Sequence, residues 1–274
     1  MNYLKLIMIL LVSLTQVACG PMALVSAVGS TVNNAAYNAA ERDLNNPKPS
    51  RDEQAFKVAI ANMNLGIEYM RQGKYEDALE KLNRSILAKP DFAPSYNVLG
   101  LLYQQLGEKD KAETHFKKSL KLDPTDSSTY NNYALFLCSN DRLEEAEATF
   151  LNAANNPFYD SPEIALTNAG ICVYDNKPEV GEEYFKQALV KNPNFSHALL
   201  QMADISYNRG QYKSSQQYLE RFKKNANHNP KSLWLGIRVY SELGYKDEVS
   251  SYALLLRNKY PDSQETKSLM EWDF

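Results

Sequence analysis

The chain has 274 residues, with 30 basic and 33 acidic side chains and a formal net charge of −3. Nucleic-acid binders usually carry a basic excess or a basic patch, so this balance argues against a nucleic-acid partner. The hydrophobic fraction of 44 % is ordinary for a folded protein and favours globular structure over disorder.

Residues 1–18 are predicted to be a lipoprotein signal peptide. Lys5 is followed by an apolar run over residues 6–14 that is too short to span a bilayer. The stretch that follows the run ends in Ala18, Cys19 and Gly20, which resembles a bacterial lipobox and implies lipidation of the Cys19 thiol. An ordinary secretory signal cut near residues 25–27, or an uncleaved anchor, are the alternatives. All three place the rest of the protein across the inner membrane.

Residues 19–57 are rich in Asn, Ala and charged residues and poor in large apolar ones. Such a segment buries too little apolar surface to fold alone, so we expect a flexible tether. Residues 58–274 are expected to form the folded domain.

The folded domain begins with two nearly identical stretches. Gly66 and Gly100 are 34 residues apart, as are Pro90 and Pro124. Each stretch contains two helical patterns, with small residues where two helices must approach and a proline that ends the unit.

This arrangement resembles the tetratricopeptide repeat, whose period is 34 residues. In the second copy the signature residues are Gly100, Tyr103, Ala112, Phe116 and Pro124. Four looser copies follow, and the residues after Pro261 are expected to begin a capping helix. The resemblance implies an all-α tetratricopeptide-repeat solenoid, a right-handed superhelix of about six helical hairpins.

The concave surface of such a solenoid is lined by the first helix of each pair and binds partner segments. The repeat register predicts groove residues on five first helices: Ile67, Met70, Asn97, Leu101, Gln104, Asn131, Leu135, Thr167, Ile171, Tyr174, Leu200, Asp204 and Tyr207. These positions carry no basic residue. We therefore expect an apolar or aliphatic partner segment rather than an acidic one.

Tyrosine is abundant, with 18 copies, and the repeat register divides these residues into two groups. Tyr174, Tyr207 and Tyr240 are candidates for the groove. The others that we place are expected to pack between helices: Tyr69, Tyr75, Tyr96, Tyr103, Tyr130, Tyr133 and Tyr212.

The sequence offers no catalytic or metal-binding residues. The three histidines lie in different repeats, and there is no CxxC motif, phosphate-binding glycine loop or serine-nucleophile elbow. Paired acids such as Glu144–Glu145 and Glu182–Glu183 are interpreted as solvated helix faces. We expect neither an enzyme nor a cofactor or small-molecule substrate.

Cys138 and Cys172 are left as a pair once Cys19 is lipidated. They lie on the first helices of the third and fourth repeats, at nearly the same height. An oxidising compartment favours a disulfide between them. The alternative is two independent buried thiols.

Three stretches go beyond the generic repeat: "NNYALFL" from Asn131, "WLGIRVY" from Trp234 and "LLLRNKYPDSQE" from Leu254. Together with the lipobox and six repeats, they resemble the PilF/PilW family of type IV pilus lipoproteins, the pilotins. The resemblance implies an outer-membrane lipoprotein that faces the periplasm. It also implies a role in the localisation, multimerisation or stability of the secretin, or in binding another pilus-assembly protein. The alternative is a general periplasmic tetratricopeptide-repeat scaffold in envelope or cell-wall assembly.

Overall fold

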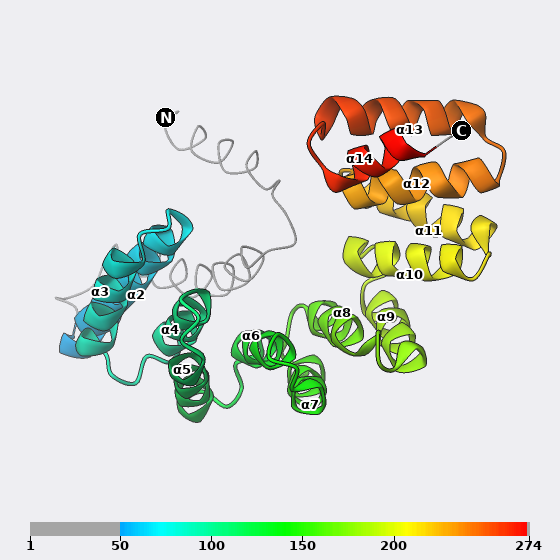
Figure 1. Cartoon of the computed structure of the whole chain (residues 1–274). Coiled ribbons are helices and arrows are strands. Elements are labelled where there is room, and N and C mark those ends of the chain that lie inside the picture. Colours follow the sequence, from blue (N-terminus) through cyan, green and yellow to red (C-terminus); the bar gives the residue numbers. More distant parts are fainter. Residues whose placement is uncertain (1–49, 273–274) are drawn as a thin grey trace, which may run out of the picture. The chain divides into compact units, whose positions relative to one another are not determined.

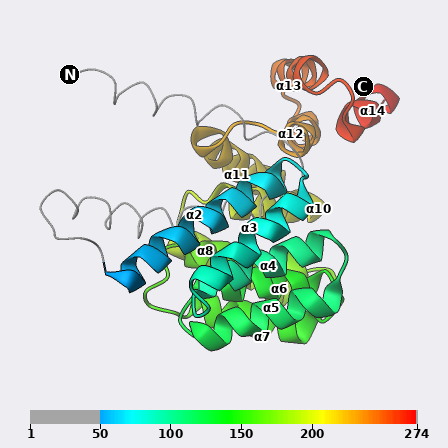
Figure 2. The same cartoon turned by 90° about the vertical axis from the view of Figure 1, so that its left-hand side faces the viewer.

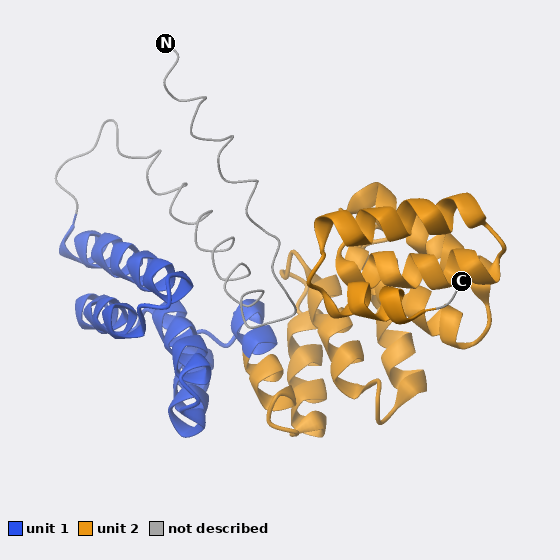
Figure 3. Cartoon of the chain, turned by 45° about the horizontal axis from the view of Figure 1, so that its top comes forward, with its two compact units in different colours: residues 1–132 blue, residues 133–274 orange. Residues whose placement is uncertain are grey.

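The computed structural model describes residues 50–272, which form thirteen α-helices and no β-strand (Figure 1). The predicted signal peptide, Cys19 and most of the predicted tether lie outside these residues. The chain divides into two compact units, residues 1–132 and residues 133–274, and the boundary falls inside one helix (Figure 3).

The described part of the first unit, unit 1, contains four complete helices and the start of a fifth. These are α2 (Arg51–Arg71), α3 (Tyr75–Ala88), α4 (Ala93–Gln105), α5 (Lys109–Leu122) and the first half of α6 (Ser127–Cys138).

The second unit, unit 2, continues from the second half of α6. Its further helices are α7 (Leu143–Ala154), α8 (Pro162–Val173), α9 (Pro178–Lys191), α10 (Ser196–Asn208), α11 (Tyr212–Asn225), α12 (Pro230–Glu242), α13 (Lys246–Lys259) and α14 (Gln264–Glu271).

Consecutive helices pack as hairpins. In unit 1, α2 packs against α3 and α4 against α5, and in unit 2 the pairs α8–α9, α10–α11 and α12–α13 do the same (Figures 1 and 2). Twelve helices in chain order make six hairpins, and α14 follows them. The all-α tetratricopeptide-repeat architecture expected from the 34-residue period is confirmed.

The small residue in each first helix is required by the close approach of its partner helix. A Cβ atom built on Gly100 would lie 2.6 Å from Phe116, and one on Gly66 would lie 2.7 Å from Leu82. Phe116 and Leu82 are themselves completely buried. The pairing of a small residue with a large one, seen in the sequence, is therefore the contact that closes each hairpin.

The turn within a hairpin also depends on local sequence. Gly73 and Gly107 adopt positive φ values of 73° and 76°, a conformation that costs glycine little. In the third hairpin Asp141 takes this place with φ of 60°. Aspartate tolerates the left-handed region better than most residues, so the turn survives the loss of glycine.

The start of the folded domain differs from the sequence prediction. Residues 51–57, expected to belong to the tether, form the first turns of α2. Ser50 caps this helix, since its side chain accepts a hydrogen bond from the Glu53 N–H at 3.2 Å, and Glu53 pairs with Lys57 one turn later. Phe56 also packs edge-on against Phe92, with ring centroids 5.5 Å apart.

The predicted capping helix is α14. Its Leu269 is 1 % exposed and packs into one cluster with Leu233 and Ile237 of α12. Ser263 caps the helix by accepting from the Thr266 N–H. Within residues 50–272, no helix is both long enough and apolar enough to cross a membrane.

Candidate partner-binding surface

In unit 1 the predicted groove residues are mostly buried. Ile67, Met70 and Leu101 are only 5 %, 4 % and 3 % exposed. The cause is direct contact between first helices, because α2 packs against α4. These three side chains therefore lie in the packed interior and do not present themselves to a partner, which corrects the expectation for them.

The amides of unit 1 are buried as well. Asn97 and Asn131 are 2 % and 3 % exposed, and the Asn132 side-chain amide donates to the Asn97 Oδ1 at 3.2 Å. Gln104 is half-buried, and its Oε1 atom has no hydrogen-bond partner. The amides of Asn97 and Asn132 thus hold each other, and among the predicted groove residues of unit 1 only Gln104 keeps partial exposure.

In unit 2 the predicted surface is more open. Thr167 is 1 % exposed and belongs to the interior, but Ile171 is 49 % exposed. The remaining predicted residues of this unit are all half-buried: Leu135, Tyr174, Leu200, Asp204 and Tyr207. Apart from Asp204, the open part of the predicted groove therefore consists of apolar and aromatic side chains on α6, α8 and α10 and at the end of α8.

Two tyrosines lie elsewhere than predicted. Tyr240 is 2 % exposed because it lies in a cluster with residues of α13 and with Leu269 of α14, and its hydroxyl donates to Glu220 of α11. Burial, this hydrogen bond and the nearby Tyr252 all raise the pKa of Tyr240. Tyr75, expected between helices, is 36 % exposed. Tyr240 is therefore a structural residue and not a groove residue.

Sequence reasoning missed a basic residue on this surface. The Arg238 guanidinium of α12 lies 4.6 Å from the centre of the Tyr207 ring, and its Nη2 is 3.4 Å from the Asp204 Oδ1. Arg238 follows Gly236 by two residues, and Cys172 follows Gly170 by the same interval. The repeat register marks Tyr240, and not Arg238, as the groove candidate of α12.

The predicted cysteine pair is brought together in unit 2. The structure pairs Cys138 of α6 with Cys172 of α8, with their Cα atoms 5.9 Å apart. This separation lies within the range that a disulfide spans without moving the backbone. Both residues are half-buried.

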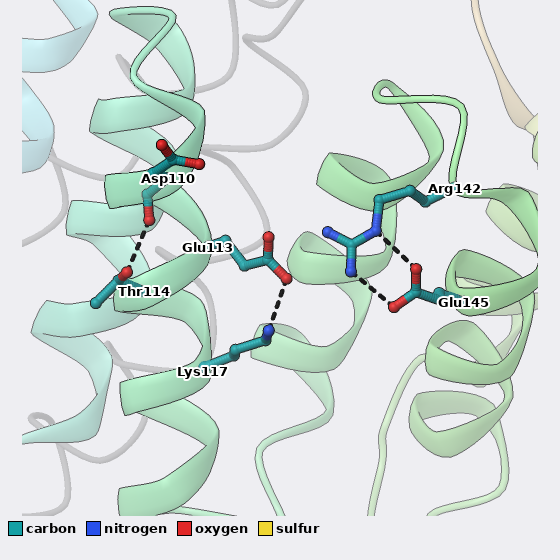
Figure 4. Close-up of polar contacts among 6 residues, drawn as sticks. All are labelled: Asp110, Glu113, Thr114, Lys117, Arg142 and Glu145. Carbon is teal, nitrogen blue, oxygen red and sulfur yellow. Dashed lines mark hydrogen bonds and ion pairs between the residues drawn. The ribbon is translucent and has the colours of Figure 1, made fainter.

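Ion pairs on the second helices are mostly exposed. Arg142 donates to both carboxylate oxygens of Glu145 at 2.7 Å, and Glu113 pairs with Lys117 at 2.8 Å (Figure 4). Glu182 is an exception to its prediction as a solvated residue. Its side chain is 11 % exposed and pairs with Arg209 and Lys186, and the hydrogen bond from Arg209 is the main cause of its lowered pKa.

The histidines have separate surroundings. His115 stacks on Tyr103 with ring centroids 5.2 Å apart, and His228 meets Tyr252 at 4.9 Å. Burial lowers the pKa of His115, His197 and His228. Within residues 50–272, no three side chains of His, Cys, Asp or Glu are grouped so that they could hold a metal ion.

Models of the tetratricopeptide repeat match residues 93–126, 115–148 and 197–226, and a related TPR model matches residues 66–107. Among characterised proteins, the type IV pilus assembly protein PilF of Pseudomonas aeruginosa is 31 % identical over 215 residues, which cover 78 % of this chain and 85 % of the relative. An uncharacterised protein of Haemophilus influenzae is 26 % identical over 117 residues, 43 % of this chain and 65 % of that protein.

Two solved structures resemble the chain over most of its length. Pseudomonas aeruginosa PilF matches with a TM-score of 0.69 and 29 % identity, covering 80 % of this chain and 99 % of that structure. PilW, a type IV pilus biogenesis factor, matches with a TM-score of 0.65 and 28 % identity, covering 78 % and 98 %. The likeness therefore extends across the repeats and is not confined to one hairpin.

Proposed function

Because the chain belongs to the PilF family of type IV pilus assembly proteins, we propose that it supports type IV pilus biogenesis by binding a partner protein through its first helices. The partner is the pilus secretin, whose localisation, multimerisation or stability in the outer membrane the protein assists. The observation that carries this proposal is a relationship of 31 % identity that spans 85 % of PilF.

The contact surface that we propose is the open part of the predicted groove in unit 2. Apolar and aromatic side chains that remain partly exposed are typical of the contacts that dominate binding energy. Ile171, Tyr174 and Leu200 meet this description, on α8 and α10.

We also propose that the protein is anchored to the periplasmic face of the outer membrane through Cys19. One acyl chain gives only marginal membrane binding, so lasting attachment needs several chains. Labelling cells with a fatty-acid analogue tests this, and the label is expected to disappear in Cys19→Ala. Equal labelling of both proteins contradicts the anchor.

In this compartment we propose that Cys138 and Cys172 form a disulfide. Mass spectrometry of periplasmic protein, alkylated without reductant, is expected to find both residues unmodified by the alkylating agent. Free, alkylated thiols on both residues contradict the bridge.

Affinity capture from envelope extract tests the proposed function directly. The secretin is expected to be the main protein captured, and Ile171→Asp is expected to reduce capture about tenfold or more, because a charge must be desolvated in an apolar contact.

Leu254→Asp is the matched control for this experiment. Leu254 is 61 % exposed but lies on α13, a second helix of the same unit. Capture of other envelope proteins without the secretin would favour a general periplasmic scaffold. Equal capture by Ile171→Asp and the wild type would mean that the partner uses another face.

A further inference from the structure

Four aromatic side chains and one arginine lie in a row across α10, α11, α12 and the end of α14 in unit 2. Trp272, after α14, meets Trp234 of α12 edge-on, with ring centroids 5.3 Å apart. Arg238 lies 5.8 Å from the Trp234 ring and 4.6 Å from Tyr207 of α10. Tyr207 in turn lies 5.5 Å from Tyr212. All five side chains are half-buried, so each retains an accessible part.

The C-terminal helix closes one side of this row. Leu233, Ile237 and Tyr240 of α12 are covered in the cluster that contains Leu269 of α14. Arg238, on the same helix as these covered residues, contacts Asp204 and Tyr207 of the predicted groove on α10.

Arg238 is held in position but weakly neutralised. Its contact with the Asp204 Oδ1 measures 3.4 Å, longer than the 2.7–2.9 Å usual for a charge-assisted hydrogen bond. Its Nε atom is buried and has no hydrogen-bond partner, so the donors left for a ligand are those of the two terminal nitrogens. Both side chains of the pair are partly exposed, at 26 % and 47 %, and pairs of this kind add little to stability.

We infer that this row binds a partner segment that carries a carboxylate beside an aromatic side chain. The carboxylate pairs with Arg238, which stacking on Tyr207 and Trp234 already orients, so less side-chain freedom is lost on binding. The aromatic side chain packs on the exposed parts of Tyr207 and Trp234. Trp, Tyr and Arg are the residue types that most often dominate binding energy.

This inference deepens the proposed function and rests on it for the partner's identity. It also departs from the sequence-based expectation of a purely apolar segment. That expectation assumed a groove without basic residues, and Arg238 supplies one.

The chain contains only two tryptophans, and both lie in the row. Intrinsic tryptophan fluorescence of the full chain therefore reports on this surface. The probes are acetylated, amidated octapeptides with a central phenylalanine–aspartate, phenylalanine–asparagine or alanine–aspartate pair. We expect the phenylalanine–aspartate peptide to bind about tenfold more tightly than either of the others, the effect of one charge-assisted contact or one aromatic contact.

Arg238→Gln is expected to bind the aspartate and asparagine peptides equally, and Arg238→Lys to lose most of the preference because an ammonium lacks the planar fork. Arg257→Gln, on the exposed face of α13, is the matched control and is expected to keep the wild-type preference. Equal affinities of the wild type for both peptides, a preference that persists in Arg238→Gln, or no fluorescence change up to millimolar peptide overturns the inference.

If Arg238→Gln fails to fold, Asp204→Asn decides the matter. This variant leaves Arg238 in place and removes the competing carboxylate, so the aspartate peptide is expected to bind more tightly. Unchanged or weaker binding overturns the inference. The capture experiment is independent of these peptides. If the protein captures the secretin but shows no peptide preference, the inferred site is wrong and the proposed function stands. If it shows the peptide preference but does not capture the secretin, the site stands and the proposed function is wrong.

Discussion

The two units hold neighbouring repeats together by different chemistry. In unit 1 the Ser85 hydroxyl donates to the Ala59 carbonyl at 2.6 Å and lies 2.6 Å from the Ser95 hydroxyl. The same arrangement recurs 34 residues later, where Ser119 donates to the Ala93 carbonyl at 2.8 Å and meets Thr129 at 3.2 Å. All four hydroxyl-bearing residues are fully buried.

In unit 2 this hydroxyl is lost. Ala153 stands 34 residues after Ser119 and is completely buried. The later repeats carry individual links instead. The Cα atoms of Cys138 and Cys172 lie 5.9 Å apart, where the proposed disulfide would join two repeats, and Glu147 of α7 accepts from Tyr184 of α9 at 2.7 Å. Repeats that keep the same sequence thus reproduce the same bond, whereas diverged repeats depend on contacts found only once.

The largest effect is expected from removing the cysteine pair. If the disulfide forms, it closes a loop of 34 residues, and reducing it should lower the free energy of unfolding by about 3 kcal/mol. Thermal unfolding with and without reductant measures this, with Cys138→Ala/Cys172→Ala as the control that reductant should not affect. Hydrogen exchange should rise in unit 2 and stay unchanged in α2–α5. If reductant changed hydrogen exchange by the same amount in both units, the disulfide would not be what distinguishes unit 2 from unit 1.

A second test compares two glycines in equivalent positions. A Cβ at Gly170 would lie 2.9 Å from the Gly181 carbonyl oxygen as well as 2.5 Å from Phe185, whereas at Gly66 the closest atoms belong to the Leu82 side chain and the nearest backbone atom, the Ala78 carbonyl oxygen, lies 3.3 Å away. We expect Gly170→Ala to cost about 2 kcal/mol and Gly66→Ala about 1 kcal/mol. Denaturant unfolding of both variants gives the difference. A larger cost at Gly66 would show that backbone contact is not what sets the penalty.

A third test converts unit 1 to the pattern of unit 2. Ser119→Ala installs the residue found at position 153 and leaves the Ala93 carbonyl without its side-chain donor. We expect a loss of about 1 kcal/mol. Ser250→Ala is the control, because the Ser250 hydroxyl bonds the Lys246 carbonyl on the exposed face of α13. Equal stability of Ser119→Ala and the wild type would mean that the repeated hydroxyl contributes nothing.

The smallest effect concerns acid. Burial raises the pKa of Glu147, but hydrogen bonds from Tyr184 and Lys177 outweigh it, and the net pKa is lowered from 4.5. Glu147 therefore stabilises the fold above pH 4.5, and this contribution is lost as pH falls through its folded-state pKa. In unit 1 burial raises the pKa of Asp126 above 3.8, so its contribution has the opposite sign and weakens as pH rises.

Stability measured against pH separates these two carboxyl groups. We expect Glu147→Gln to flatten the loss of stability below pH 4.5 by less than about 1 kcal/mol, since the pair is partly exposed. Asp126→Asn should reduce the loss of stability that accompanies a rise in pH above 3.8. A steeper acid limb in Glu147→Gln would contradict the assignment.

The fold was predictable because its determinants are local and repeated. Gly100 and Phe116 appear in the sequence at the interval that a helical hairpin requires, and the structure brings them into contact. The start of α2 was missed for the opposite reason. Its stability depends on the Ser50 cap and on Phe92, which directly precedes α4, and a polar, Asn-rich composition reveals neither.

The candidate surface was less predictable, because repeat register assigns a face but not its exposure. Leu101 and Ile171 occupy equivalent positions one residue after a glycine, yet one is 3 % and the other 49 % exposed. Tyr240 was misplaced because it is buried in a cluster that joins α12 to α13 and to α14, and α14 belongs to no repeat. Arg238 was missed because the repeat register placed Tyr240, and not Arg238, on the groove side of α12.

The cysteine pair also has a mechanical consequence. When the bridge is closed, pulling on the two ends of the chain cannot draw out the residues between Cys138 and Cys172. An extended chain covers about 3.3–3.6 Å per residue, so the 34-residue loop withholds roughly 110 Å of length, including the whole of α7. A protein tethered at one end and held by a partner at the other would then stretch to a fixed limit, and the loop around α7 would bear no tension.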